Sequence, residues 1–239
     1  MKKQLTLLAT LFLLITSFGI QAQSVDKIID GYFEIIGGKD KFRKMKAMVM
    51  EGTAQSPQGE LQIKMYNQRP NKSKLEVTLQ DKTFVVQAFD GKNAWGTNFM
   101  TQKSEKKSDE VAKEMASEAF EPFYLDYKKK GHKIELEGTE EIDGTECYKL
   151  KGTKKDGKVQ YLFFDKESNA LIMTRVTSTT GPMKGQQIDA YVADYKEVDG
   201  IMMPHSLTRS IGGQKSTLTI NKITINPKLE DKVFTFTKE

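Results

Sequence analysis

The sequence predicts an α+β fold, in which a strongly curved antiparallel sheet forms an incomplete β-barrel and helices cover its concave face. Apolar residues recur at helical spacing before Ala47 and alternate with a period of two after it. Asp-Gly steps recur between segments rich in β-branched and aromatic residues, and this dipeptide favours tight hairpin turns. A meander of this length must close on itself or have its concave face covered, and the helices can cover it.

Residues 1–22 have the pattern of a secretory signal peptide. Lys2 and Lys3 form a positively charged start, a short apolar run over 5–15 follows, and cleavage is expected after residue 22. The apolar run is too short for a membrane-spanning helix. We therefore expect residues 23–239 to form a single exported domain in the periplasm, with an extracellular location as the alternative.

Helices are expected at 25–36, 39–46 and 108–120. The first has an N-cap residue in Ser24 and carries one apolar stripe. The stripe consists of Val25, Ile28, Ile29, Tyr32, Phe33 and Ile36. Pro122 ends the last helix, and we expect the apolar run around it to cover another apolar surface or, alternatively, to pack on the end of the sheet.

Strands are expected along the rest of the chain, and the short turns between most of them make sequence neighbours antiparallel partners. The expected strands are 47–55, 60–69, 72–80, 82–89, 93–99, 132–142, 145–154, 158–165, 169–179, 186–196, 201–211 and 214–225. The strands at 158–165 and 169–179 carry apolar residues on both faces. They are therefore expected to contact apolar groups on both sides or to contribute to a cavity.

The balance of charges argues against a nucleic-acid partner. The chain has 37 Lys and Arg against 32 Asp and Glu, and without the two lysines of the signal peptide the mature chain carries a net charge of about +3. Cys147 is the only cysteine, so we expect neither an internal disulfide nor a lipid anchor at the cleavage point. We expect its thiol to pack as a small apolar group.

No catalytic or metal-binding arrangement is recognisable in the sequence. His132 and His205 have no acidic or cysteine neighbour at metal-ligand spacing, and the chain has no phosphate-binding loop, dinucleotide fingerprint or serine-nucleophile motif. We therefore expect no catalytic residue, no metal and no cofactor, in a protein that is not an enzyme. A small secreted hydrolase is the competing class, and it would need convergent polar residues that the sequence does not offer.

Short motifs in this chain resemble a known family. The stretch Gly59–Lys72 is an apolar strand that ends in Arg69-Pro-Asn, the segment Asp90-Gly-Lys-Asn-Ala-Trp95 is a turn that leads to a tryptophan, and Val233-Phe-Thr-Phe236 is similar to a closing strand. In this order, behind a signal peptide, they resemble the LolA-like periplasmic outer-membrane lipoprotein carriers, the LolA/LolB-like half-barrels.

The resemblance implies a function in which an apolar cavity shields acyl chains. It implies a periplasmic lipid- or lipoprotein-binding carrier in outer-membrane lipoprotein sorting. The partners that it implies are a lipid or acylated lipoprotein, an inner-membrane release complex and an outer-membrane acceptor, and no nucleic acid. The alternative is a secreted non-catalytic β-scaffold or interaction module with no lipid cavity.

The resemblance also implies residues for the lid and the cavity. Carried over by the Arg-Pro-Asn motif, Arg69 is the polar residue that helps to hold the lid closed; the alternative is a solvent-facing residue at a strand end. The cavity is expected between sheet and helices, lined partly from 47–99 and capped near 100–125. The expected lid and cavity residues are Arg69, Trp95, Ile29, Phe33, Met65, Met115 and Phe123.

Overall fold

The structure is a computed structural model that describes residues 24–56, 59–118, 120–179 and 183–236 of the chain. The signal peptide expected over residues 1–22 lies outside the described residues and stays a prediction.

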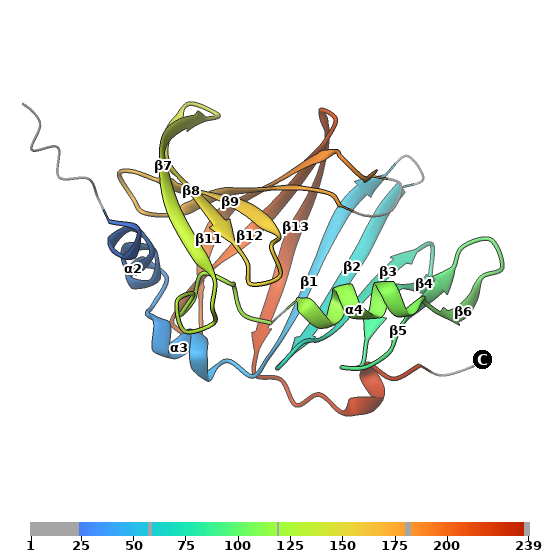
Figure 1. Ribbon diagram of the computed structural model, residues 1–239. Helices are drawn as coiled ribbons and strands as arrows, with labels where there is room; N and C mark the ends of the chain where they lie inside the picture. Colours follow the sequence, from blue (N-terminus) through green and yellow to red (C-terminus); the bar gives the residue numbers. More distant parts are fainter. Residues whose placement is uncertain (1–23, 57–58, 119, 180–182, 237–239) are drawn as a thin grey trace, which may run out of the picture.

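Few helices and many strands make up the described chain (Figure 1). The helices are α2 (Val25–Ile35), α3 (Lys39–Lys44), α4 (Asp109–Ser117) and the short 3-10 helix η2 (Asp231–Val233). The strands are β1 (Ala47–Ser56), β2 (Gly59–Gln68), β3 (Lys72–Leu79), β4 (Lys82–Phe89), β5 (Ala94–Asn98), β6 (Lys103–Lys106), β7 (Lys133–Ile142), β8 (Thr145–Thr153), β9 (Val159–Asp165), β10 (Leu171–Thr177), β11 (Gln187–Val198), β12 (Ile201–Ile211) and β13 (Gln214–Ile225).

The strands form one 13-stranded antiparallel sheet with the order β6-β5-β4-β3-β2-β1-β13-β12-β11-β10-β9-β8-β7. The strands β6 and β7 stand at its two edges and do not pair with each other, so the sheet curves without closing (Figure 1). This arrangement confirms the predicted incomplete β-barrel with helices over its concave face. Because β6 and β7 follow each other in sequence, the chain between them must cross that face from one edge to the other.

The register of the strand pairs shows that α2 and α4 pack on the same face of the sheet. Paired residues of antiparallel strands point to the same side, and successive residues alternate. Leu150 and Leu162 pack against α2, and Phe89 and Ala94 pack against Met115 of α4. When the register is followed from strand to strand, all four sheet residues lie on the same side. The helices α2 and α4 therefore cover one face, and within the described residues the other face carries only the short 3-10 helix η2.

The N-terminal helix begins and ends where its sequence indicates. The Ser24 hydroxyl accepts a hydrogen bond from the Lys27 amide at 3.3 Å, which caps the first turn. Gly37 follows the last turn with a φ of 104°, and the Gly38 amide donates to the Phe33 carbonyl at 2.7 Å. The apolar stripe of α2 is buried as predicted, with Ile29 only 2% exposed.

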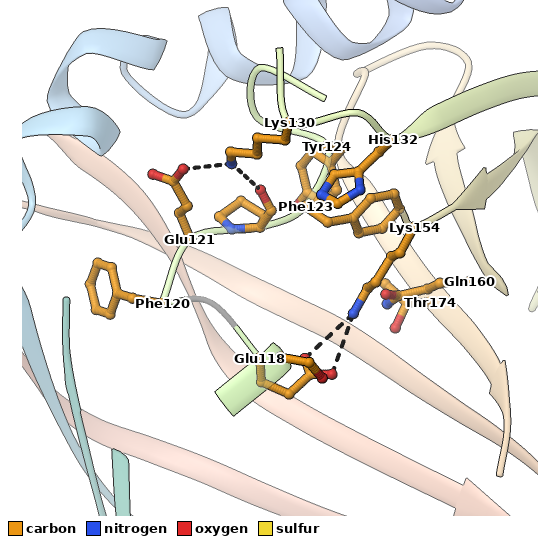
Figure 2. Close-up of a pocket in the computed structure, with 12 residues that line it drawn as sticks. Glu118, Phe120, Glu121, Phe123, Tyr124, Lys130, His132, Lys154, Gln160 and Thr174 are labelled. Carbon is orange, nitrogen blue, oxygen red and sulfur yellow. Dashed lines mark hydrogen bonds and ion pairs between the residues drawn. The ribbon is translucent and has the colours of Figure 1, made fainter. Parts of the chain in front are cut away.

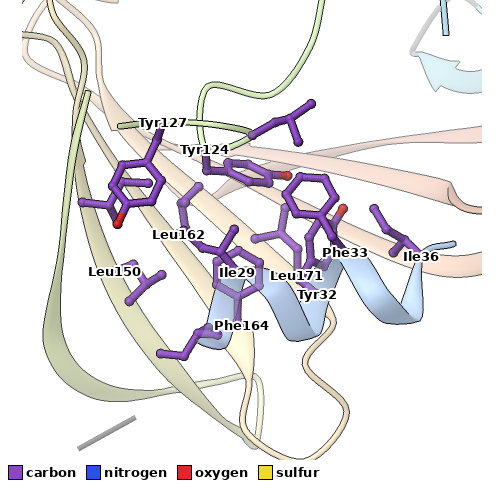
Figure 3. Packing of buried hydrophobic residues seen from close by; sticks show 13 residues of the cluster. Ile29, Tyr32, Phe33, Ile36, Tyr124, Tyr127, Leu150, Leu162, Phe164 and Leu171 are labelled. Atoms are coloured by element: carbon purple, nitrogen blue, oxygen red, sulfur yellow. The ribbon is translucent and has the colours of Figure 1, made fainter. Parts of the chain in front are cut away.

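Four apolar clusters form the core, and all but the third lie on the helix side of the sheet; the fourth joins Met115 of α4 to Phe89 and Ala94. The largest joins α2, the segment after α4 and the strands β7–β10 (Figure 3). A second surrounds Met45 and includes Phe120. The third holds Cys147, Phe163 and Met173, so the central strands contact apolar groups on both faces, as predicted. Burial raises the pKa of the Cys147 thiol to about 11, which keeps it in the neutral form.

The structure differs from the sequence predictions in two segments. The strand β6 lies in a segment that we did not expect to be a strand; it is an exposed edge strand without an apolar face, held by main-chain pairing with β5. The closing strand expected over Val233–Phe236 was wrong: the chain forms η2 and a turn instead. The Phe234 ring is buried there, and the Phe234 carbonyl accepts a hydrogen bond from the Trp95 indole at 2.7 Å.

Candidate functional site

The connection from β6 to β7 carries α4 and a segment that we call the lid segment, residues 120–132. The Ser108 hydroxyl caps α4 by accepting from the Val111 amide at 3.4 Å, and α4 ends at Ser117 instead of reaching residue 120. The chain then runs over the sheet as an extended and turn-rich stretch until β7. Because the connection joins the two edge strands, it lies over the concave face of the sheet.

Arg69 ties the lid segment to α3 and to the end of β2. Its Nε donates to the Met45 carbonyl at 2.6 Å, and its Nη2 donates to the Phe42 carbonyl at 3.0 Å. Its Nη1 pairs with the Glu121 carboxylate at 2.5 Å, and the guanidinium lies 5.3 Å from the centre of the Phe120 ring. The side chain is half-buried, and its planar fork satisfies three acceptors at once.

Glu121 is the acceptor that links Arg69 to the rest of the lid segment. Its second carboxylate oxygen pairs with Lys130 at 2.5 Å. Burial acts to raise the pKa of Glu121, but the hydrogen bonds and charges of Lys130 and Arg69 outweigh it and hold that pKa below its ordinary value. The Phe120 amide also donates to the Pro70 carbonyl at 3.0 Å, so main chain and side chains together hold this end of the lid segment.

Further polar contacts hold the lid segment and the C-terminal end of α4. The Asp126 carboxylate accepts two hydrogen bonds from Arg43 of α3, at 2.7 and 2.9 Å. On the other side, Lys154 lies 3.4 Å from both carboxylate oxygens of Glu118, and Lys158 donates to the Ser117 hydroxyl at 3.1 Å. Solvent-exposed ion pairs contribute about 0–1 kcal/mol each, so each of these contacts holds the segment only weakly.

Three cavities open around the lid segment and the end of α4. One, of about 360 Å³, lies between Pro70-Asn71, the end of α4, the lid residues Lys130 and His132 and the turn Lys154–Asp156. The other two lie over the sheet. The first of these has a volume of about 310 Å³ and lies between the lid residues Phe120–Tyr124, Lys154 of the turn after β8, and the strands β9 and β10 (Figure 2). The second, of about 270 Å³, lies between Glu114 and Glu118 of the α4 side and the strands β9–β11. Both include Glu118, Lys154 and Gln160, so they meet at the end of α4. Each is at or below the lower end of the volumes of small-molecule sites, about 300–1,000 Å³.

The space under α2 is filled by aromatic side chains. Tyr124 of the lid segment inserts between α2 and β9, with its ring centre 5.9 Å from that of Tyr32 and 6.0 Å from that of Phe164 (Figure 3). Burial raises the pKa of the Tyr124 phenol well above its ordinary value, so the phenol stays neutral. Ile29 and Phe33 belong to this packed cluster and do not face an open cavity.

The remaining predicted site residues fall in different places. Phe123 lines the cavity of about 310 Å³, and Met115 packs α4 onto Phe89 and Ala94. Met65 is half-buried on the helix side of the sheet. Trp95 lies on the opposite face, because it pairs with Ala88 and its indole contacts the C-terminal segment. The structure thus brings Arg69 and Phe123 to the lid segment and separates Trp95 from it.

Several polar residues of the site have no signature in the sequence. Glu121, Lys130 and Lys154 come from the lid segment and from the turn after β8, and only folding brings them together. The single sequence signal is the position of Glu121, an acidic residue inside the apolar run 120–125. Within the described ranges, no group of His, Cys, Asp and Glu side chains is arranged to hold a metal ion. None of the described helices combines the length and the apolar character needed to cross a membrane.

Comparison by sequence gives little information about this chain. A family model described only as that of an uncharacterized protein matches residues 121–238, which is just under half of the chain. No curated protein matches the sequence significantly.

Comparison by structure finds the same architecture in solved proteins. A LolA superfamily protein from Nitrosomonas europaea superposes with a TM-score of 0.56 at 15% identity, over 89% of this chain and 98% of that one. A domain described as a candidate outer membrane lipoprotein-sorting protein from Vibrio parahaemolyticus gives 0.52 at 13% identity, over 84% and 96%. A DUF1329 family protein from Desulfovibrio piger gives 0.56 at 12% identity, over 88% and 97%. The chain therefore has a LolA-like fold.

Proposed function

We propose that the mature chain is an exported, non-catalytic carrier that shields the acyl chains of a lipid or lipoprotein against the concave face of its sheet. One observation carries the proposal: the segment that crosses this face is held at Arg69 by polar contacts to Glu121, Phe42 and Met45. Polar contacts of this kind can exchange with water when the segment moves. A lid that is held in this way can open without unfolding the sheet.

The sheet beneath supplies apolar surface for an acyl chain. Half-buried apolar side chains follow one another on the helix-facing side of β2 and β3, where the register pairs them. They are Leu61, Ile63, Met65, Leu75 and Val77. Burial contributes about 0.8 kcal/mol per CH₂ group, so a chain of about sixteen such groups gains on the order of 12 kcal/mol before ordering costs. Release at a useful rate then requires a closed state that is only slightly favoured.

We infer outer-membrane lipoprotein sorting in the periplasm, with residues 1–22 as signal peptide and 23–239 as one domain. An inner-membrane release complex and an outer-membrane acceptor are the partners such a role requires. The LolA-like fold supports this assignment, as does the name of the Vibrio parahaemolyticus domain.

A fluorescent fatty-acid probe tests the binding surface. The mature protein should bind the probe, and added lipid should displace it. Met65→Glu, which puts a charge on the apolar face, should weaken binding at least about tenfold, because a carboxylate resists burial beside an acyl chain. Gln62→Glu is the matched control, since Gln62 is exposed on the other side of the same strand and should leave binding unchanged.

The packed aromatic cluster under α2 favours one alternative, a secreted scaffold or interaction module without a lipid cavity. The same experiment separates the two functions. A protein that binds no probe, and that retains no lipid when native mass spectrometry is applied to material from its own cell envelope, would be a scaffold. Equal binding by wild type and Met65→Glu would also contradict the proposed surface.

A further inference from the structure

The hairpin between β5 and β6 ends in an apolar tip that the described structure leaves uncovered. Met100 is 95% exposed and Phe99 is 62% exposed, whereas Ile35, the next most exposed large apolar residue in the described chain, is 42% exposed. In Figure 1 this hairpin projects from the edge of the sheet. Adjacent exposed apolar side chains on a projecting hairpin are typical of an interaction site.

The tip is held in a defined shape. The Asn98 side-chain oxygen accepts a hydrogen bond from the Met100 amide at 2.9 Å, and the Asn98 carbonyl accepts one from the Gln102 amide at 2.7 Å. The Phe99 ring lies 5.9 Å from the ring of Phe84 in the neighbouring strand. The fold therefore presents these side chains to solvent from an ordered turn. Their exposure to water is unfavourable, and burial against a partner surface would remove this cost.

Lysine side chains follow the tip along β6. Lys103 pairs with Asn98 beside the tip, and Lys106 and Lys107 lie at the base of the hairpin, opposite Trp95 and Ala94. All three are exposed, with Glu105 as the one carboxylate among them. An apolar tip with basic flanks matches the interface of a bilayer with anionic headgroups, where apolar groups enter the acyl boundary and lysines contact the headgroups.

The charge pattern of the whole sheet agrees with this placement. Strand directions put the tip at the same strand ends as the β3–β4 and β8–β9 connections. The hairpin connections at those ends, with their flanking residues, contain the lysines Lys82, Lys103, Lys154, Lys155, Lys158 and Lys184 and the acids Asp81 and Asp156. The connections at the opposite strand ends contain the bases Arg69, Lys72, Lys92 and Lys166 and the acids Asp90, Asp143, Asp165, Glu167 and Asp199. Among these hairpin connections, positive charge is therefore in excess only at the strand ends that carry the tip, while the basic helix α3 lies at the opposite strand ends.

We propose that the β5–β6 hairpin is a membrane-docking tip, in which Phe99 and Met100 enter the interface of an anionic bilayer while Lys103 beside them and the lysines at the same strand ends contact its headgroups. The proposal rests on the proposed function in one respect, that a carrier of lipids must reach a bilayer.

Vesicle flotation of the full mature protein tests the tip. Wild type should float with vesicles of phosphatidylethanolamine and phosphatidylglycerol, less with phosphatidylethanolamine alone, and less at high salt. The double variant F99S/M100S should lose at least about tenfold in partitioning, because it removes most of the apolar area that would enter the interface. Ile35→Ser is the matched control, since it removes an exposed apolar side chain from α2 and should float like wild type.

A fluorescence measurement checks insertion directly. Trp95 is the only tryptophan and is buried, so its emission should not respond to vesicles. Met100→Trp adds an exposed reporter, and its emission should shift to the blue with anionic vesicles. An unchanged spectrum, or equal flotation of wild type and F99S/M100S, would overturn the proposal. So would a concentration-dependent dimer that F99S/M100S abolishes without any vesicle binding, because the tip would then be a protein contact.

Probe binding in vesicle-free solution separates this proposal from the carrier function. Wild type and F99S/M100S should bind the fatty-acid probe equally, because the tip lies outside the three cavities around the lid segment. Probe binding without flotation would refute the docking tip and leave the carrier function standing. Flotation that depends on the tip, with no probe binding by either protein, would refute the carrier and keep the tip.

Discussion

Arg69 makes the polar contacts that join the lid segment to the end of α3. It joins the carbonyls of Phe42 and Met45 to Glu121. Breaking a partly buried pair from one side leaves the other partner with unmet hydrogen bonds, so this contact is sensitive to substitution on either side.

Replacement of Arg69 by leucine should separate lipid retention from lipid release. Arg69→Leu removes the polar contact but adds apolar surface, so lipid should be retained as well as by wild type or more tightly, and its transfer to acceptor membranes should be slower. Transfer of a fluorescent lipid between carrier and vesicles measures both quantities. Arg69→Lys keeps the charge near Glu121 without the planar fork and should fall between the two. If both retention and transfer are unchanged in Arg69→Leu, the role carried over from the family is wrong for this chain.

Because of Glu121, the closed position of the lid segment should become less stable at acidic pH. Its pKa is held below the ordinary value of 4.5, so the closed state favours the ionised carboxylate. This contribution to closure is complete above pH 4.5 and is lost as the pH falls through the lowered pKa. Exchange of bound probe should therefore accelerate below about pH 4.5 in wild type. Glu121→Gln should remove this acceleration, whereas Glu141→Gln, in an exposed part of β7, should keep it.

The helix α2 acts as a structural element that holds the β7–β10 half of the sheet in shape. Its buried stripe and the lid residue Tyr124 fill the space between them. The same packing explains why the predicted cavity residues Ile29 and Phe33 lie in a core. Any cavity for a long acyl chain must then come from movement of the lid segment, or from the half-buried face of β2 and β3.

Truncation of the α2 stripe should destabilise the protein strongly. Ile29→Ala removes a side chain that is 2% exposed and should lower the free energy of unfolding by about 2–5 kcal/mol. Ile35→Ala on the same helix, where the side chain is 42% exposed, should change it by less than about 0.5 kcal/mol. Urea denaturation followed by circular dichroism measures both. Equal effects would mean that α2 does not pack as described.

At the scale of the whole molecule, the C-terminal segment covers the face of the sheet opposite α2 and α4. Phe234 is fully buried there, and its carbonyl accepts the hydrogen bond from the Trp95 indole. The two ends of the described chain therefore lie on opposite faces of the sheet, α2 on one and this segment on the other.

Loss of Phe234 should be visible through the single tryptophan. Phe234→Ala should lower the free energy of unfolding by about 3–5 kcal/mol, because it empties a buried aromatic site. It should also shift the Trp95 emission to the red as water reaches the indole. Phe99→Ala, where the ring is mostly exposed, should change neither quantity appreciably. A red shift without loss of stability would show that the segment only shields Trp95.

The elements that the sequence predicts well are those with a local pattern. The alternation in Leu218 and Ile220 indicates a strand with one buried face, and the stripe on α2 indicates a helix with one buried side. The strand β6 has no such pattern, because main-chain pairing at the sheet edge forms it. The face on which Trp95 lies depends on the register of β4 with β5, which no short motif encodes.

In the candidate site, too, a local motif identifies one residue, and only the fold brings its partners together. The Arg-Pro-Asn motif identifies Arg69, and the contacts of Arg69 with α3 are consistent with a polar residue beside a lid. Its partner Glu121 lies 52 positions away, and Lys154 meets Glu118 from a turn on the other half of the sheet. Pairs at such distances arise from the fold as a whole, so a reading of local sequence does not find them.

The crossing from β6 to β7 has one more mechanical consequence. Both of its ends are fixed in edge strands, so the connection cannot open by rotation about a single hinge. Its middle can move away from the sheet while both ends stay in place. The length of chain between Lys106 and Lys133 then sets how wide the gap beneath it becomes. Such a gap admits a slender hydrocarbon tail lengthwise and keeps a bulky folded domain outside.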